Sequence, residues 1–85
     1  MKPGALYKVV ISELGLIQKS NNITRIFTKD TILTFLKVEW GYSGEDAYFF
    51  ADNNIYYRRI YGLEDWIQEV NENDSGKPIQ DSIFF

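Results

Sequence analysis

The architecture of this chain follows from residues 47–61, AYFFADNNIYYRRIY. Two runs rich in aromatic and β-branched residues flank a polar break at residues 52–54, and such runs favour pleated, half-buried strands. Asparagine adopts the left-handed backbone that tight hairpin turns require, so Asn53 and Asn54 can form a two-residue type I′ loop. This segment therefore predicts a β-hairpin that the other strands must cover.

The position of the turn sets the register, because a one-residue slip moves every side chain to the other face of the sheet. The turn allows two registers, and the two-asparagine loop is preferred. In that register Phe50 pairs with Tyr57 and Tyr48 pairs with Arg59. Small side chains suit the interior of a small barrel, so the inner face should hold Ala47, Phe49, Ala51, Tyr56, Arg58 and Ile60. The outer face then holds Tyr48, Phe50, Tyr57 and Arg59.

Alternating patterns predict three further strands. The first covers residues 5–13 and ends before Gly15, and a polar surface loop follows at residues 18–22. The second covers residues 23–28, and the longest covers residues 31–40. The predicted core consists of Tyr7, Val9, Ile11, Ile26, Ile32, Leu36, Val38, Phe49, Ile60, Trp66 and Val70.

The segment that follows Ile60 fits two structures. Leu63, Trp66, Ile67 and Val70 have the i, i+3, i+4, i+7 spacing of a short amphipathic helix. The alternative is a helical turn at residues 63–65 followed by a closing strand at residues 66–70. Elements this short are poorly separated by periodicity, so both remain open.

Composition fits one small domain with a single core. The chain has 85 residues, of which 45% are hydrophobic and 16% aromatic. We assign the domain to residues 1–70, and residues 71–85 to a polar linker and a tail that contains Ile79, Ile83, Phe84 and Phe85. The sequence shows no signal peptide, no apolar run of membrane-spanning length and no cysteine, so we expect a soluble cytoplasmic protein.

Catalysis is not expected. The chain has no histidine and no cysteine, which removes the commonest general base and the commonest metal ligands. The adjacent acids at residues 45–46 and 64–65 are explained by solvation or by a helix start, and no glycine-rich phosphate loop is present. We therefore expect neither a metal nor a cofactor.

Five short strands, consecutive hairpins and a helical turn or short helix before Val70 make residues 5–70 resemble the small SH3-like β-barrels. Such barrels are common among short bacterial and bacteriophage proteins. The Ala5-Leu6-Tyr7 segment is similar to the motif that supplies ligand-binding tyrosines in peptide-binding SH3 domains. In those domains an acidic loop, a tryptophan pair and a Pro-x-x-Tyr motif follow. Here the loop is rich in lysine and asparagine and no proline lies between Pro3 and Pro78, so the resemblance does not imply binding of proline-rich peptides.

The aromatic surplus predicts a non-catalytic protein-binding module, for example a small adaptor or an inhibitor of a partner or host protein. Interface hot spots favour Trp, Tyr and Arg. The predicted partner-binding residues are Trp40, Tyr42, Tyr48, Phe50, Tyr57 and Arg59. The tail or a second copy in a homodimer could instead cover this surface.

The alternative function is nucleic-acid binding, in which Tyr56, Tyr57 and Tyr61 would stack on bases beside Arg58 and Arg59. A net charge of −3 disfavours this function, because nucleic-acid-binding surfaces are broadly basic.

Overall fold

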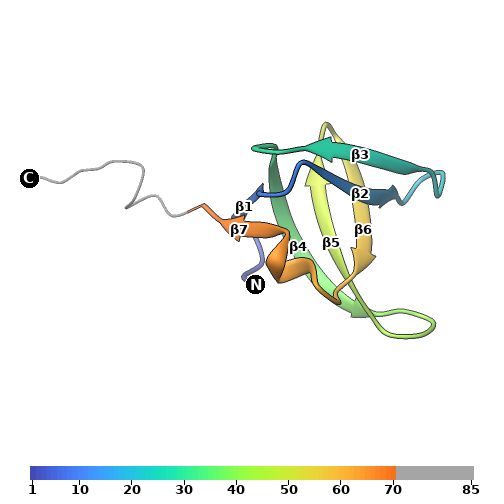
Figure 1. Cartoon of the computed structure of the whole chain (residues 1–85). Coiled ribbons are helices and arrows are strands. Elements are labelled where there is room, and N and C mark those ends of the chain that lie inside the picture. Colours follow the sequence, from blue (N-terminus) through green and yellow to red (C-terminus); the bar gives the residue numbers. More distant parts are fainter. Residues whose placement is uncertain (71–85) are drawn as a thin grey trace, which may run out of the picture.

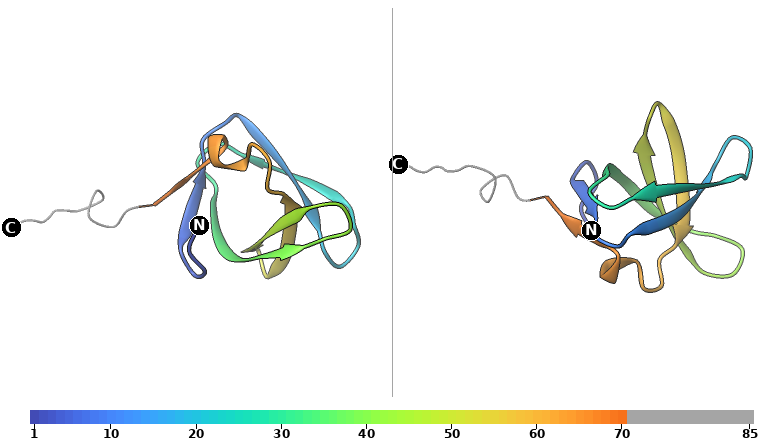
Figure 2. Two further views of the ribbon diagram at one scale, coloured as in Figure 1. Left: turned by 90° about the horizontal axis from the view of Figure 1, so that it is seen from below. Right: turned by 45° about the horizontal axis from the view of Figure 1, so that its top comes forward.

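Seven antiparallel strands curl into a half-barrel in the computed structural model, which describes residues 1–70 (Figures 1 and 2). The elements are β1 (Leu6–Val9), β2 (Glu13–Gln18), β3 (Thr24–Thr28), β4 (Ile32–Trp40), β5 (Glu45–Ala51), β6 (Asn54–Arg59), the 3-10 helix η1 (Leu63–Asp65) and β7 (Ile67–Glu69). Their order in the sheet is β3-β2-β6-β5-β4-β1-β7. The mainly β fold is confirmed and is compatible with an SH3-like barrel. The predicted linker and tail lie outside the described residues.

The β5–β6 hairpin forms as expected, but its turn lies one residue earlier than predicted. Asp52 and Asn53 occupy the left-handed region, with φ of 51° and 62°. Both residue types tolerate this backbone, and Asn54 is left to pair with Ala51. The predicted cross-strand pairs are therefore wrong by two residues. A shift of two keeps each side chain on its face, so the predicted inner and outer faces of the hairpin are correct.

Tyr48 consequently pairs with Tyr57, and Phe50 pairs with Ile55. Arg59, which was expected opposite Tyr48, pairs with Asp46 instead.

The predicted first strand is two strands. The chain leaves β1 after Val9, where the Asp30 amide donates to the Val9 carbonyl oxygen at 2.8 Å, and it re-enters the sheet as β2. Gly15 lies within β2 and does not end a strand. A Cβ at Gly15 would stand 3.3 Å from the Thr24 side chain and 3.6 Å from that of Ile26, so glycine leaves room for the neighbouring strand β3. This extra strand is one reason why the sheet has more than the five strands predicted.

The predicted core residues of the longest strand, Ile32, Leu36 and Val38, are not buried. Leu33 and Phe35 are buried, whereas Ile32 and Val38 are exposed. A β-bulge accounts for part of the error: Phe35 pairs with Phe49 and Lys37 pairs with Tyr48, which leaves Leu36 without a partner. One unpaired residue reverses the alternation, so no single period-two pattern describes β4.

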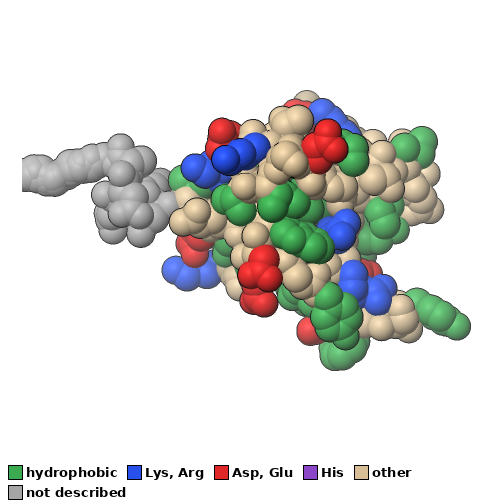
Figure 3. Space-filling model, in the orientation of Figure 1, with side chains coloured by type: hydrophobic (Ala, Val, Ile, Leu, Met, Phe, Trp, Pro, Cys, Tyr) green, Lys and Arg blue, Asp and Glu red, His purple; other side chains and the backbone are tan. Residues whose placement is uncertain are grey.

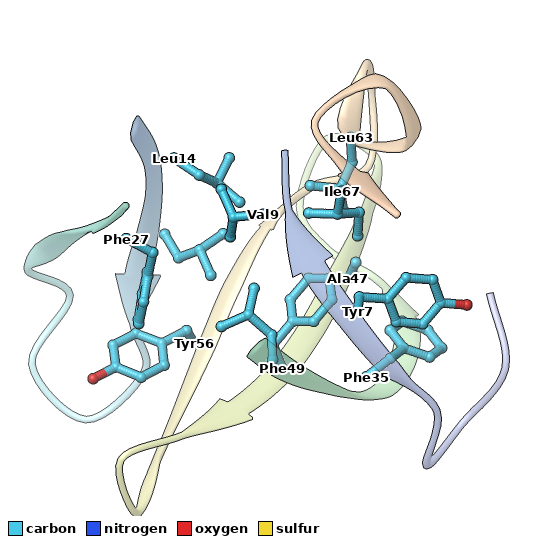
Figure 4. Close-up of a cluster of buried hydrophobic side chains, with 12 residues drawn as sticks. Tyr7, Val9, Leu14, Phe27, Phe35, Ala47, Phe49, Tyr56, Leu63 and Ile67 are labelled. Carbon is cyan, nitrogen blue, oxygen red and sulfur yellow. The ribbon is translucent and has the colours of Figure 1, made fainter. Parts of the chain in front are cut away.

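The core lies inside the curl (Figure 4). It contains Tyr7, Val9, Leu14, Leu16, Phe27, Leu33, Phe35, Ala47, Phe49, Tyr56, Leu63 and Ile67. Tyr7 packs edge-to-face on Phe35, and Phe27 packs edge-to-face on Tyr56. Of the predicted core residues, Tyr7, Val9 and Phe49 are buried, Ile11 and Trp66 pack against the core, and Leu36, Ile60 and Val70 are half-buried. Ile26, Ile32 and Val38 are exposed and were predicted wrongly.

The segment after Ile60 adopts the second of the two predicted structures. The turn η1 buries Leu63, and β7 then pairs with β1, with Ile67 opposite Val9. Within β7 only Ile67 is buried, and the predicted core residues Trp66 and Val70 on either side of it are half-buried.

Phe49→Ala should lower the free energy of unfolding by about 3–5 kcal/mol, because it truncates a fully buried aromatic side chain that contacts Phe35. Phe50→Ala is the matched control. It removes the same atoms from a side chain that is 41% exposed, so its cost should be clearly smaller. Urea denaturation of both variants measures the difference, and equal losses would contradict the inner position of Phe49.

Candidate functional site

The β4–β5 hairpin projects beyond the rest of the barrel and carries the most exposed aromatic side chains of residues 1–70 (Figures 1 and 2). Trp40 ends β4 and is 78% exposed, and Tyr42 is fully exposed in the loop that follows. Tyr61 is 74% exposed, and the amide of its neighbour Ile60 donates to the Glu45 carbonyl oxygen at 3.0 Å. We call Trp40, Tyr42 and Tyr61 the aromatic tip. Figure 3 shows hydrophobic side chains at this projecting end.

A partly buried ion pair holds the loop that carries Tyr42 of the aromatic tip. Arg59 Nε donates to Asp46 Oδ1 at 2.8 Å, and Arg59 Nη1 donates to Ser43 Oγ at 2.9 Å. Asp46 is only 8% exposed and is the buried charged residue of the described chain. A buried carboxylate requires a charged or hydrogen-bonding partner, and here that partner also holds the loop. The guanidinium thus ties β6 to the loop that carries Tyr42.

Two glycines allow this network to pack against the loop backbone. A Cβ at Gly41 would collide with Asp46 Oδ2, and a Cβ at Gly44 would lie 2.9 Å from Arg59 Nη1. The loop is closed by the Gly41 amide, which donates to the Gly44 carbonyl oxygen at 2.6 Å. The loop conformation is therefore set by contacts with Asp46 and Arg59.

A tyrosine pair lies on the outer face of β5 and β6. The rings of Tyr48 and Tyr57 stack with centroids 5.5 Å apart. Lys19 Nζ and Lys37 Nζ lie 5.6 Å and 5.3 Å from the Tyr48 centroid. Tyr57 Oη donates to Asn22 Oδ1 at 3.2 Å. Both tyrosines are half-buried, so much of their surface is already used within the protein.

Burial raises the pKa of the Tyr48 phenol above its ordinary value. The carboxylates of Glu39 and Asp46 act in the same direction, whereas the Lys37 ammonium opposes them. The same ammonium donates to Glu39 Oε2 at 2.9 Å, and this hydrogen bond lowers the pKa of Glu39.

The structure separates the six residues predicted as a partner-binding surface. Tyr48, Phe50, Tyr57 and Arg59 share the outer face, as expected. Trp40 lies on the opposite side of the ribbon, since Val38 pairs with the buried Ala47 and Trp40 is two residues further along β4. Tyr42 lies at the end of the hairpin. These six side chains cannot all contact one flat ligand.

Sequence reasoning missed Tyr61 as a neighbour of the hairpin loop and missed the lysines beside Tyr48. The β6–β5 register brings Tyr61 to this end, and that register could not be read from the turn residues alone. Lys37 was visible in the sequence, but the bulge before it decides that it pairs with Tyr48.

The residues expected to bind nucleic acid are largely engaged within the protein. Tyr56 is buried and accepts a hydrogen bond from Arg25 Nη1 at 2.8 Å. Arg58 lies over the Trp66 ring at 4.6 Å and donates to the Gly15 carbonyl oxygen at 2.9 Å. Arg59 pairs with Asp46.

Among residues 1–70, no group of three or more potential metal-ligating side chains lies together. The same part of the chain has no helix long and apolar enough to cross a membrane. No family model, no curated protein and no solved structure matches this chain.

Asp46→Asn should lower the free energy of unfolding by about 1–3 kcal/mol, because it leaves the Arg59 guanidinium without its charged partner at a partly buried site. Glu39→Gln is the control. It breaks an exposed pair with Lys37 and should therefore cost clearly less than Asp46→Asn. Chemical denaturation of both variants tests this difference. Equal costs would mean that the Asp46–Arg59 pair is no more important than a surface pair.

Tyr48 should make stability sensitive to alkaline pH. The phenol ionises first in the unfolded chain, so its contribution is intact below about pH 10 and is lost as pH rises through the raised folded-state pKa. Tyr48→Phe should therefore lose less stability than the wild type above about pH 10. Tyr42→Phe, which removes the hydroxyl of a fully exposed tyrosine, is the matched control. Urea denaturation at a series of pH values tests this, and parallel curves for wild type and Tyr48→Phe would contradict it.

Proposed function

We propose that this protein is a non-catalytic protein-binding module that inserts its aromatic tip into a concave apolar site on a partner protein. The observation that carries the proposal is the support of the tip's loop by the partly buried Asp46–Arg59 pair. A buried ion pair gives little net stability compared with well-packed apolar residues. Here it fixes the conformation of the loop between Trp40 and Glu45.

Such support favours binding because the loop is ordered before the partner arrives. Rigid aromatic side chains bury a large area and lose little conformational entropy, which is why Trp and Tyr are frequent hot spots. Trp40 and Tyr42 project from a hairpin whose strands are paired up to Trp40 and Glu45. A protruding pair of this kind suits a pocket and is poorly suited to a flat surface.

The proposal includes the class of module. The 3-10 turn directly before the last strand, and a last strand that pairs with the first, support an SH3-like barrel. A chain of this size that acts only through binding would serve as an adaptor or as an inhibitor of its partner, and we propose a cytoplasmic location from its lack of cysteine.

Affinity capture with the full-length protein tests this function. Wild type, Trp40→Ala, Tyr42→Ala and the control Ile26→Ala are immobilised and exposed to nuclease-treated lysate of the cells that encode the chain. Ile26 is an exposed side chain on β3, away from the tip. Proteins retained by wild type and by Ile26→Ala, but lost with both tip variants, are the expected result.

The dissociation constant for a purified partner then measures how much each tip residue contributes to binding. Trp40→Ala should weaken binding by at least about 30-fold, as expected for a hot spot worth about 2 kcal/mol. The protein-binding function is contradicted if capture requires intact nucleic acid. The tip assignment is contradicted if both variants bind the partner as well as Ile26→Ala does.

A further inference from the structure

A second apolar surface lies on the outer face of the sheet, away from the aromatic tip. Leu6 pairs with Thr34, Thr34 with Phe50, and Phe50 with Ile55, so these residues form one continuous row across β1, β4, β5 and β6. Ile32 precedes this row on the same face of β4. The four apolar side chains Leu6, Ile32, Phe50 and Ile55 are each between 39% and 45% exposed. We call them the outer strip.

The outer strip is about as long as a short peptide in extended conformation. Its row crosses three gaps between neighbouring strands, which at about 4.8 Å each gives a length of about 14 Å. An extended segment of four or five residues, at about 3.3 Å per residue, covers that length. A stable contact between two folded proteins usually needs about 800 Å² on each partner, far more than one row of side chains offers.

The described chain ends beside this strip. The Val70 amide donates to the Leu6 carbonyl oxygen at 2.9 Å, which places residue 70 next to the first residue of the row. The sequence continues with eight residues, 71–78, and then with the apolar side chains of Ile79, Ile83, Phe84 and Phe85. Eight residues can span up to about 28 Å, which is twice the length of the row.

Charge is also complementary. Lys8 pairs with Ile32, and the Lys19 amide donates to the Ile55 carbonyl oxygen at 2.8 Å, so a lysine lies near each end of the outer strip. Residues 71–85 contain three acids and one lysine, a net charge of −2. One of these acids, Asp81, lies between Ile79 and Ile83 in the sequence.

We propose that residues 79–85 bind across the outer strip of the same chain, with their apolar side chains on Leu6, Phe50 and Ile55 and with Asp81 near Lys8 or Lys19. This contact leaves the aromatic tip free. It therefore goes beyond the proposed binding function and does not depend on it.

A single introduced cysteine tests the proposal in the full-length protein, because the chain has no cysteine of its own. A nitroxide is attached to Ser82→Cys, and amide NMR signals are compared before and after chemical reduction of the label. The amides of Thr34, Phe50 and Ile55 should lose most of their intensity while the nitroxide is active, and those of Tyr42 and Ser43 at the hairpin end should lose much less. Gln80→Cys serves as a second labelling site, so that a label that itself blocks docking does not decide the result.

Two controls distinguish binding within one chain from binding to a second copy and from simple tethering near the strip. Isotope-labelled protein without the nitroxide is mixed with unlabelled nitroxide-bearing protein, and broadening in this mixture would mean that the segment binds a second copy. The double substitution Ile83→Ser and Phe84→Ser in the nitroxide-bearing chain should restore the strip signals. Broadening that survives this substitution would show only that the segment is tethered nearby. That result, broadening in the mixture, or no strip broadening from either labelling site would each overturn the proposal.

Discussion

The β-bulge at Leu36 is the constraint on which the rest of the structure depends. Before it, Leu33 and Phe35 face the core; after it, Val38 and Trp40 take the inner side while Lys37 turns outward beside Tyr48. A bulge also increases strand twist, which helps a single strand to pair with β1 at one end and with β5 along the rest. If Leu36 paired regularly with Tyr48 and no bulge formed, Trp40 would lie on the same face as Tyr48.

The strands and the inner face of the β5–β6 hairpin could be predicted from the sequence because small and aromatic residues alternate there with period two. The prediction fails in β4, where the unpaired Leu36 shifts the alternation of inner and outer side chains by one residue. No feature of the sequence around Leu36 indicates a bulge, and both faces of β4 carry apolar residues, so the pattern predicts Ile32 in the core in place of Leu33. Gly15 was interpreted as a strand end because glycine often ends strands, whereas its function here is to admit the side chains of β3.

The candidate site was predictable in its residue types and not in its arrangement. Trp40 and Tyr42 were chosen because Trp and Tyr are common at interfaces, and both are highly exposed. Arg59 was chosen for the same reason, but cross-strand pairing with Asp46 makes it a support for the loop. Its role depends on a register that shifts by two residues when the turn moves by one, and local sequence does not determine that shift.

The pairing of β1 with β7 connects the two ends of the described chain and has a consequence for its local stability. Tyr7 lies opposite Glu69, 62 positions later, and β7 has only three residues at the edge of the sheet. Short edge strands open more easily than central ones, and such openings expose amides to hydrogen exchange without global unfolding. We therefore expect the Val10 and Val70 amides, which bond to Trp66 and Leu6, to exchange faster than those of β5. Detachment of β7 would expose Val9 and Ile67, so we expect proteolysis of the folded protein to begin where β7 pairs with β1.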